Sequence, residues 1–208
     1  MLNIVTVQVG NYCGRGAEYV DRLFEGFSHN LPHTEYECFC LTDDPASLPP
    51  GVEALEPEPG IDGWWNKISL FKPNTFRWGE RVLFSDLDAM AIGDLSDIAA
   101  YKGKFAAIRD FYNHTHIQSA LMAWEAGTVD HIWQGWNGSG KPQFDPRGDQ
   151  AFIESVQAEA DYWQDMLPGQ VMSFKDCRRL GGIPSSVRLV CFHGRPRPHE
   201  IGFTLEEL

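Results

Sequence analysis

The chain has 208 residues, of which 17 are Lys or Arg and 29 are Asp or Glu, so its formal net charge is −12. This length suits one well-buried α/β domain, and a single domain over 1–208 is expected. The negative charge repels nucleic acid and anionic lipid surfaces, which are excluded as expected partners. An anionic small molecule can still bind where a divalent cation or a few basic residues reverse the local field.

The five cysteines are odd in number and lack the paired short spacings of a structural zinc site, so we expect buried, reduced thiols. The first residues read as a strand rather than as a signal peptide. No apolar run approaches the length of a membrane span. These features favour a cytoplasmic protein without a transmembrane segment.

The predicted elements begin with a buried strand over residues 2–9, a Gly-containing loop and a helix over about 17–29. In that helix four apolar residues recur at offsets 0, 3, 4 and 7 and therefore share one face: Val20, Leu23, Phe24 and Phe27. Strand, loop and helix in this order open the nucleotide-binding type of α/β fold.

The remaining elements follow from apolar runs, turn residues and prolines. We expect strands over 36–42, 81–85, near 104–108, 170–174 and 188–192; helices over 64–72, near 119–125 and from Asp149; a Pro-rich connection over 45–59; and a Trp- and Gly-rich loop over 133–148.

Asp86 and Asp88 follow the apolar strand predicted over 81–85. Side chains alternate along an extended chain, so both carboxylates fall on the same side. Two like charges this close are costly unless a cation lies between them, and Mg²⁺ or Mn²⁺ suits oxygen ligands. The alternative is an acidic pair that only begins a turn, as the nearby Gly93-Asp94 suggests.

The segment from Phe84 to Leu95, which contains Asp86-Leu-Asp88, resembles the DXD segment of GT-A glycosyltransferases, especially glycosyltransferase family 8 with its glycogenin-like and lipopolysaccharide-galactosyltransferase-like members. The resemblance implies a GT-A-type, Rossmann-like mixed sheet flanked by helices. It also implies metal-dependent transfer of a sugar from a nucleotide-sugar donor, which we expect to be a UDP-sugar. The acceptor would be a carbohydrate or another hydroxyl-bearing molecule, and the transfer would retain the anomeric configuration. Four further segments match the family in order: the first strand with its Asn11-Tyr12 loop resembles its uracil-binding start, Trp65–Phe71 its lysine-bearing helix, Gly148–Gln150 its D-Q pair, and Phe192–Pro198 its late H-x-G-x-x-K-P segment.

The resemblance also implies roles for single residues. Asp86 would contact the ribose and the metal, while Asp88 and His193 would ligate Mn²⁺ or Mg²⁺, which leaves coordination positions for the diphosphate. Asp149 and Gln150 would act as catalytic residues at the reacting face. The implied donor-binding residues are Thr6, Val7, Gln8, Asn11, Tyr12, Lys67, Asp86, Gln118, Gly194 and Arg195.

Each of these residues has a simpler interpretation. His193 can be a histidine satisfied near a strand end, and Asp149 can be the N-cap of the following helix. Arg195 and Arg197 stand where the family usually has Lys, and they can equally form a solvated basic tail.

Two regions leave the acceptor undefined. Where the family commonly has F-N-[ST]-G-[VI], this chain places Gln118 and Ser119, which would replace the amide and hydroxyl contacts. The aromatic residues Trp133, Trp136 and Phe144 are either a platform for a sugar acceptor or core packing under a loop.

Other classes also use an apolar strand followed by D-x-D. A haloacid-dehalogenase-like phosphohydrolase is one alternative, although the Ala89–Ile92 segment and the position of the pair far from the N-terminus fit it poorly. Sugar-phosphate nucleotidyltransferases share the fold type, but their Gly-rich basic loop is only faintly matched by Gly14-Arg-Gly16. A nucleotide-sugar-binding domain without turnover is the non-enzymatic alternative.

Overall fold

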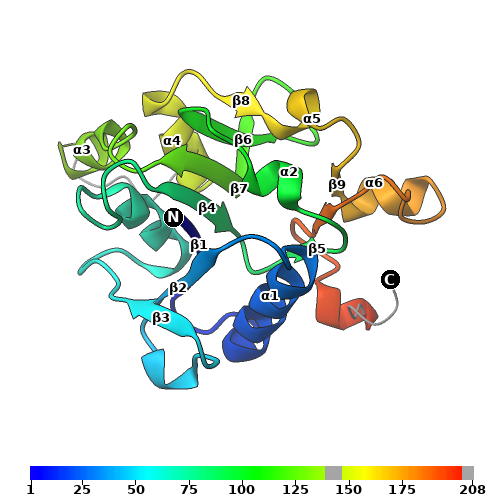
Figure 1. Ribbon diagram of the computed structural model, residues 1–208, viewed down its shortest axis with the longest axis horizontal. Helices are drawn as coiled ribbons and strands as arrows, with labels where there is room; N and C mark the ends of the chain where they lie inside the picture. Colours follow the sequence, from blue (N-terminus) through cyan, green and yellow to red (C-terminus); the bar gives the residue numbers. More distant parts are fainter. Residues whose placement is uncertain (139–146, 203–208) are drawn as a thin grey trace.

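The larger sheet of the protein has seven strands in the order β3-β2-β1-β4-β7-β6-β8 (Figure 1). The computed structural model describes residues 1–138 and 147–202. β1, β2, β3 and β4 run parallel, whereas β7 is antiparallel to both of its neighbours, so the predicted mixed sheet is confirmed. The strands are β1 (Leu2–Gln8), β2 (Tyr36–Thr42), β3 (Val52–Leu55), β4 (Arg81–Ser85), β6 (Phe105–Arg109), β7 (Ile117–Glu125) and β8 (Asp161–Tyr162).

A second, three-stranded sheet has the order β5-β10-β9. Its strands are β5 (Ala89–Ala91), β9 (Val171–Ser173) and β10 (Leu189–Cys191). The α-helices are α1 (Gly16–Asn30), α2 (Ser96–Ala99), α3 (His131–Gly138), α4 (Asp149–Val156), α5 (Trp163–Met166) and α6 (Phe174–Arg179). The 3-10 helices are η1 (Pro45–Ser47), η2 (Gly63–Phe71) and η3 (Pro198–Ile201).

Two hydrophobic clusters cover the two faces of the larger sheet. One joins the apolar face of α1 to α2, to Trp163 of α5 and to the small sheet. The other joins η2, α3 and α4 to the opposite face. The helix predicted over 17–29 is confirmed, and the four residues of its predicted apolar face are all buried. Helices cover both faces of the sheet. Ligands of such folds bind at the carboxyl ends of the strands.

β7 corrects the helix predicted near 119–125. Its residues are good helix formers, and nearly all are buried, so no alternation of apolar and polar residues marks the strand. The structure gives the reason, because Leu121 and Ala123 enter one core cluster while Met122 and Trp124 enter the other. A central strand covered on both sides reads as a continuous apolar run.

The strands predicted over 36–42 and 81–85 are confirmed. Three connecting regions contain more regular structure than their sequences predict. The Pro-rich connection over 45–59 includes η1 and the edge strand β3, the helix predicted over 64–72 is the 3-10 helix η2, and α3 occupies the start of the loop predicted over 133–148.

The C-terminal segment returns to the start of the chain. In Figure 1 it lies beside α1 and β5. The Tyr19 hydroxyl of α1 is 2.6 Å from Nδ1 of His199, a hydrogen bond that ties the two segments together. None of the helices within residues 1–138 and 147–202 has the length and apolar character needed to cross a bilayer.

Candidate active site

The Asp86-Leu-Asp88 segment forms a tight turn between β4 of the large sheet and β5 of the small sheet. The Asp86 N–H donates to the carbonyl of Ala120 at 2.8 Å, which extends the pairing of β4 with β7. The Asp88 carbonyl accepts from the N–H of Phe192 at 2.9 Å, which joins the turn to the end of β10. Leu87 is buried in the core, and the two carboxylates therefore project at the junction of the sheets.

Lys67 bridges two of the predicted site residues. Its ammonium nitrogen lies 3.0 Å from Oδ1 of Asp86 and 3.2 Å from Oδ2 of Asp149. It also donates to Oγ of Ser119 at 2.9 Å, and this hydroxyl donates to Oδ2 of Asp149 at 2.7 Å. Four residues from η2, the β4 end, β7 and α4 thus form one hydrogen-bonded group, which we call the Lys67 cluster.

The Lys67 cluster is charged and mostly dry. The Lys67 side chain is only 3% exposed, and that of Asp149 only 7%. Burial alone lowers the pKa of Lys67, but the charges of Asp149 and Asp86 reverse this and raise its pKa above the usual value. Lys67 therefore stays protonated and neutralises one of the two carboxylates.

The backbone at Gly148 sets the position of Asp149. Gly148 has φ 73° and ψ −152°, a conformation that glycine alone adopts readily. Gly148 is the N-cap residue of α4, and Asp149 is the first helical residue, which corrects the alternative that Asp149 is the N-cap. Its carboxylate bonds to Lys67 and Ser119 instead.

Asp88 has a different cation, Arg197. The Arg197 guanidinium donates to Oδ2 of Asp88 and, at 2.7 Å, to the hydroxyl of Tyr12. It also lies over the Tyr12 ring, 5.2 Å from the centroid. Burial, followed by the charge of Asp86, raises the pKa of Asp88 to about 7 despite the opposing effect of Arg197.

His193 faces an aromatic group beside this turn. One ring nitrogen, Nε2, is 2.6 Å from Oγ of Ser173. The ring stacks on Phe111 at 5.3 Å between centroids and meets Tyr112 edge-on at 5.2 Å. Burial, together with the charge of Lys175, lowers the pKa of His193, so the imidazole is neutral at pH 7.

The carboxylates of Asp86 and Asp88 have the chemistry of a divalent cation site, because Mg²⁺ and Mn²⁺ favour oxygen ligands. In this structure each carboxylate is balanced by a basic side chain, and His193 bonds to Ser173. Within the described ranges, 1–138 and 147–202, no three His, Cys, Asp or Glu side chains are grouped to hold a metal ion. The carboxylate pair fits a metal, whereas the Nε2 atom of His193 is bonded to Ser173 in this structure.

Solved structures provide the comparison for this fold. The galactosyltransferase LgtC, in complex with donor and acceptor sugar analogues, matches with a TM-score of 0.69 and 12% identity over 94% of this chain and 88% of that chain. The bifunctional glycosyltransferase WbbM matches with a TM-score of 0.67 and 12% identity over 95% of this chain and 46% of that chain. GlyE of Streptococcus pneumoniae TIGR4 matches with a TM-score of 0.65 and 12% identity over 94% of this chain and 55% of that chain.

The chain has the GT-A glycosyltransferase fold. It spans most of LgtC and about half the length of WbbM and GlyE. No protein-family model matches the sequence, and no curated protein does. The resemblance to family 8 therefore stays a prediction.

In this GT-A fold, β1 and the loop after it lie next to the Asp86-Leu-Asp88 turn. Gln8 is buried, and its amide bonds to the Gly10 carbonyl and the Thr42 hydroxyl. The Asn11 carboxamide accepts from the Gly14 N–H at 2.6 Å. These two predicted donor-binding residues shape the loop, whereas Tyr12 alone among the loop residues reaches Asp88 through Arg197.

The other predicted donor-binding residues are placed unevenly. The Oγ1 atom of Thr6 and the Oε1 atom of Gln118 are buried without a hydrogen-bond partner among the described residues. Val7 packs at the edge of the core. The Arg195 side chain is 85% exposed and pairs with Glu200, so the structure brings Arg197 and not Arg195 to the carboxylates.

The remaining predicted residues follow their neighbours along the chain. Gln150 is the second residue of α4, directly after Asp149, and it is half-buried. Gly194 has φ 77°, and a Cβ there would lie 3.7 Å from the Lys175 ammonium. It therefore provides the turn between His193 and the segment that carries Arg197.

Sequence reasoning missed Cys191 as part of this environment. Cys191 pairs with Ala89 in the small sheet and is buried. Burial and the charges of Asp88 and Asp86 raise the pKa of its thiol well above the usual value. Its place opposite the residue after the D-x-D follows from strand pairing, which the sequence does not reveal.

The aromatic residues of α3 resolve one open alternative. Trp133 and Trp136 are buried, and Trp136 stacks on Trp65 at 5.4 Å. They are core packing rather than an acceptor platform. Phe144 lies outside the described residues.

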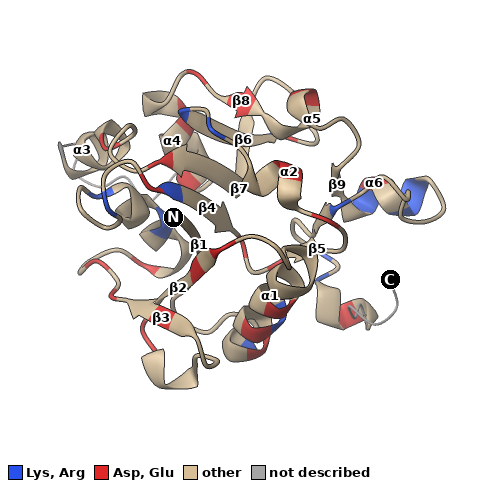
Figure 2. Cartoon of the chain, viewed as in Figure 1, with Lys and Arg blue, Asp and Glu red and all other residues tan. Residues whose placement is uncertain are grey.

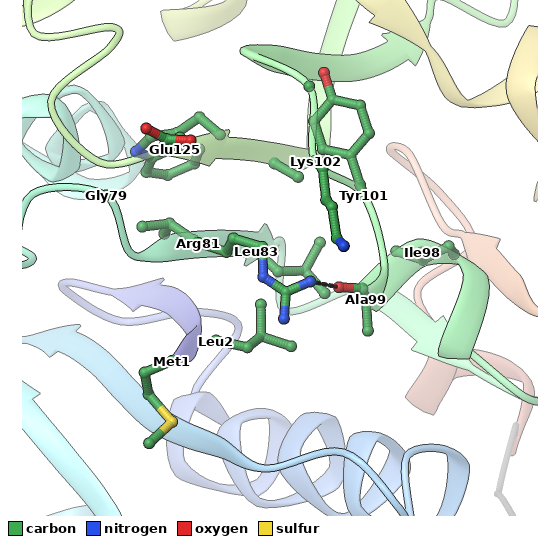
Figure 3. Close-up of a pocket in the computed structure, with 14 residues that line it drawn as sticks. Met1, Leu2, Gly79, Arg81, Leu83, Ile98, Ala99, Tyr101, Lys102 and Glu125 are labelled. Carbon is green, nitrogen blue, oxygen red and sulfur yellow. Dashed lines mark hydrogen bonds between the residues drawn. The ribbon is translucent and has the colours of Figure 1, made fainter.

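A cavity of about 250 Å³ lies at the other end of the strands and does not include this site. It is lined by Met1 and Leu2 at the start of β1 and by Arg81 at the start of β4, whose guanidinium bonds to the Ala99 carbonyl (Figure 3). Asp86 follows the opposite end of β4. The candidate active site is thus defined by its buried polar groups and not by this cavity.

Proposed function

We propose that the chain is a metal-dependent glycosyltransferase that transfers a sugar from a UDP-sugar to a hydroxyl-bearing acceptor with retention of configuration. The observation that carries the proposal is the Lys67 cluster beside Asp88. In a GT-A fold the cluster and Asp88 together place three carboxylates, two of them buried, at the end of β4 and the start of α4. Carboxylates gathered at the end of a strand are suited to bind a cation and to act on a reacting carbon.

Two basic side chains lower the negative charge of the candidate site, which would otherwise repel an anionic donor. Figure 2 shows acidic residues along α1 and basic residues on α6. Lys67 and Arg197 pair with the carboxylates, and a bound divalent cation would then supply the positive charge that a diphosphate requires.

The residues of the chain divide the work. Asp86, Asp88 and His193 would hold Mn²⁺ or Mg²⁺. When bound, the cation stabilises the negative charge on the departing nucleoside diphosphate. Asp149, fixed by Lys67 and Ser119, orients the donor sugar at the reacting face, with Gln150 beside it.

The experiment is an assay of UDP release from a panel of UDP-hexoses by the purified protein, with Mn²⁺, with Mg²⁺ and with EDTA. We expect slow hydrolysis of the UDP-sugar when Mn²⁺ or Mg²⁺ is present and none when EDTA is present. NMR should show the α-anomer of the sugar as the first product. Hydrolysis that persists in EDTA would refute the metal dependence, and β-product would refute retention.

Two alternatives give other results in the same assay. A binding domain without turnover would be stabilised by a UDP-sugar in a thermal-shift measurement but would release no UDP. A phosphohydrolase would release phosphate from p-nitrophenyl phosphate. The fold match to three glycosyltransferases favours transfer over both.

A further inference from the structure

Three aromatic side chains are strongly exposed within the described part of the chain: Trp64, Trp78 and Tyr112. Trp64 is 64% exposed, although its neighbour Trp65 is 5% exposed and stacks on Trp136. Burial of a large aromatic side chain away from water is favourable. The 3-10 helix η2 thus buries one tryptophan and leaves the adjacent one in water.

Trp64 adjoins the Lys67 cluster. A Cβ atom on Gly148 would lie 3.2 Å from the indole nitrogen of Trp64, so the indole edge rests against the backbone that precedes Asp149. Trp64 is also three residues before Lys67 on η2, and Lys67 bonds to Asp149. The indole therefore lies against the backbone next to Asp149 while most of its surface faces solvent.

Tyr112 stands at the other side of the Asp86-Leu-Asp88 turn. It is 61% exposed and packs edge-on against His193. His193 directly follows Phe192, whose N–H donates to the Asp88 carbonyl. Two exposed aromatic residues thus contact residues next to the candidate site: Trp64 lies against Gly148, and Tyr112 lies against His193. Trp64, the larger of the two, is the one that lies against the backbone before Asp149.

An exposed indole next to a site that gathers carboxylates matches the chemistry of a sugar ring. The apolar C–H face of a pyranose packs on an aromatic ring, while its hydroxyls donate to carboxylate oxygens. A lipid or peptide acceptor would call for an apolar groove or for a row of open backbone groups instead. We propose that Trp64 is an acceptor-binding residue and that the acceptor is a saccharide, an inference that rests on the proposed function.

The test compares the variants W64A and W64F with W78A. Trp78 is a matched control, because it is 78% exposed but precedes β4 at the end of the sheet away from Asp86. Each protein is assayed for UDP release in Mn²⁺, first with water alone and then with a panel of methyl hexosides and disaccharides.

We expect at least one saccharide to accelerate UDP release above hydrolysis. W64A should raise the KM for that saccharide by about tenfold or more, the equivalent of about 1.4 kcal/mol, and leave hydrolysis within about twofold of wild type. W64F should restore much of the affinity, and W78A should match wild type.

Three results separate the failures. An unchanged saccharide KM in W64A overturns the role of Trp64. Hydrolysis that no saccharide accelerates overturns the saccharide acceptor and leaves the proposed function standing. A wild-type protein that releases no UDP from any donor overturns the proposed function and this inference with it.

Discussion

Arg197 and Asp88 form an ion pair although 109 residues separate them in the chain. The pair closes the C-terminal segment over the D-x-D turn, and it gives Asp88 a cation within the protein. A cation that binds at Asp88 must therefore share the carboxylate with Arg197 or displace it. Several predictions about single residues depend on this arrangement.

Arg197→Ala should destabilise the protein in EDTA by about 2 kcal/mol, because it leaves the mostly buried Asp88 carboxylate without its cation. Arg195→Ala is the matched control, since Arg195 is 85% exposed and pairs with Glu200 at the surface. Urea unfolding of both variants provides the measurement. Equal losses of stability would show that the Arg197–Asp88 pair contributes nothing beyond an ordinary surface contact.

Lys67→Met should be more damaging, at about 3–5 kcal/mol, because two carboxylates then lose their shared buried cation. Lys72→Met is its control on the neighbouring turn. Lys72 is half-exposed and pairs with Glu58, so its loss should cost less than about 1 kcal/mol. Denaturant midpoints and slopes for the two variants decide this, and a K67M protein as stable as K72M would contradict the cluster.

The stability of the metal-free protein should depend on Asp88 between about pH 4 and pH 7. Its pKa is raised from 3.8 to about 7 by burial and by Asp86, so the folded protein binds more protons in this range than the unfolded chain. The contribution of Asp88 to stability is greatest at low pH and falls as the pH rises through this window.

Asp88→Asn removes this titration. We expect the Tm of D88N minus that of wild type to become more positive from pH 5 to pH 8 in EDTA, by several degrees. Asp94→Asn on the exposed surface should show no such rise. A difference for D88N that stays constant with pH would contradict the assignment.

Thiol labelling should find one fast cysteine. Cys13 is exposed, whereas burial raises the pKa of Cys38 to about 11 and that of Cys40 to about 12. Iodoacetamide at pH 7.5 should therefore modify Cys13 first, and Cys13→Ser should abolish the fast phase seen by mass spectrometry. A fast phase that survives in C13S would place a second reactive thiol at the surface.

The sequence predicted the parts of the fold that have local signals. The apolar residues of the helix over 17–29 recur with a clear 3.6-residue period. The strand over 81–85 is a short apolar run that ends directly before Asp86. The prediction of a helix near 119–125, where the structure has β7, was wrong. A strand buried on both faces shows no alternation of apolar and polar residues, so its helix-forming residues dominated the prediction.

The site was predicted in its residue types and only partly in its contacts. The D-x-D turn, Lys67 and Asp149 are side by side as the motif order implies. The pairing of His193 with Ser173, of Arg197 with Asp88 and of Cys191 with Ala89 could not be read from spacing, because each joins segments that only the three-stranded sheet and the C-terminal return bring together.

The most direct test of the proposed site is the rate of UDP release from the best UDP-sugar in Mn²⁺, measured for D88N and D149N beside the surface variant D94N. The account predicts that D88N and D149N each lose about 100-fold or more of the wild-type rate while D94N keeps it. Release at the wild-type rate by folded D88N and D149N proteins would contradict it.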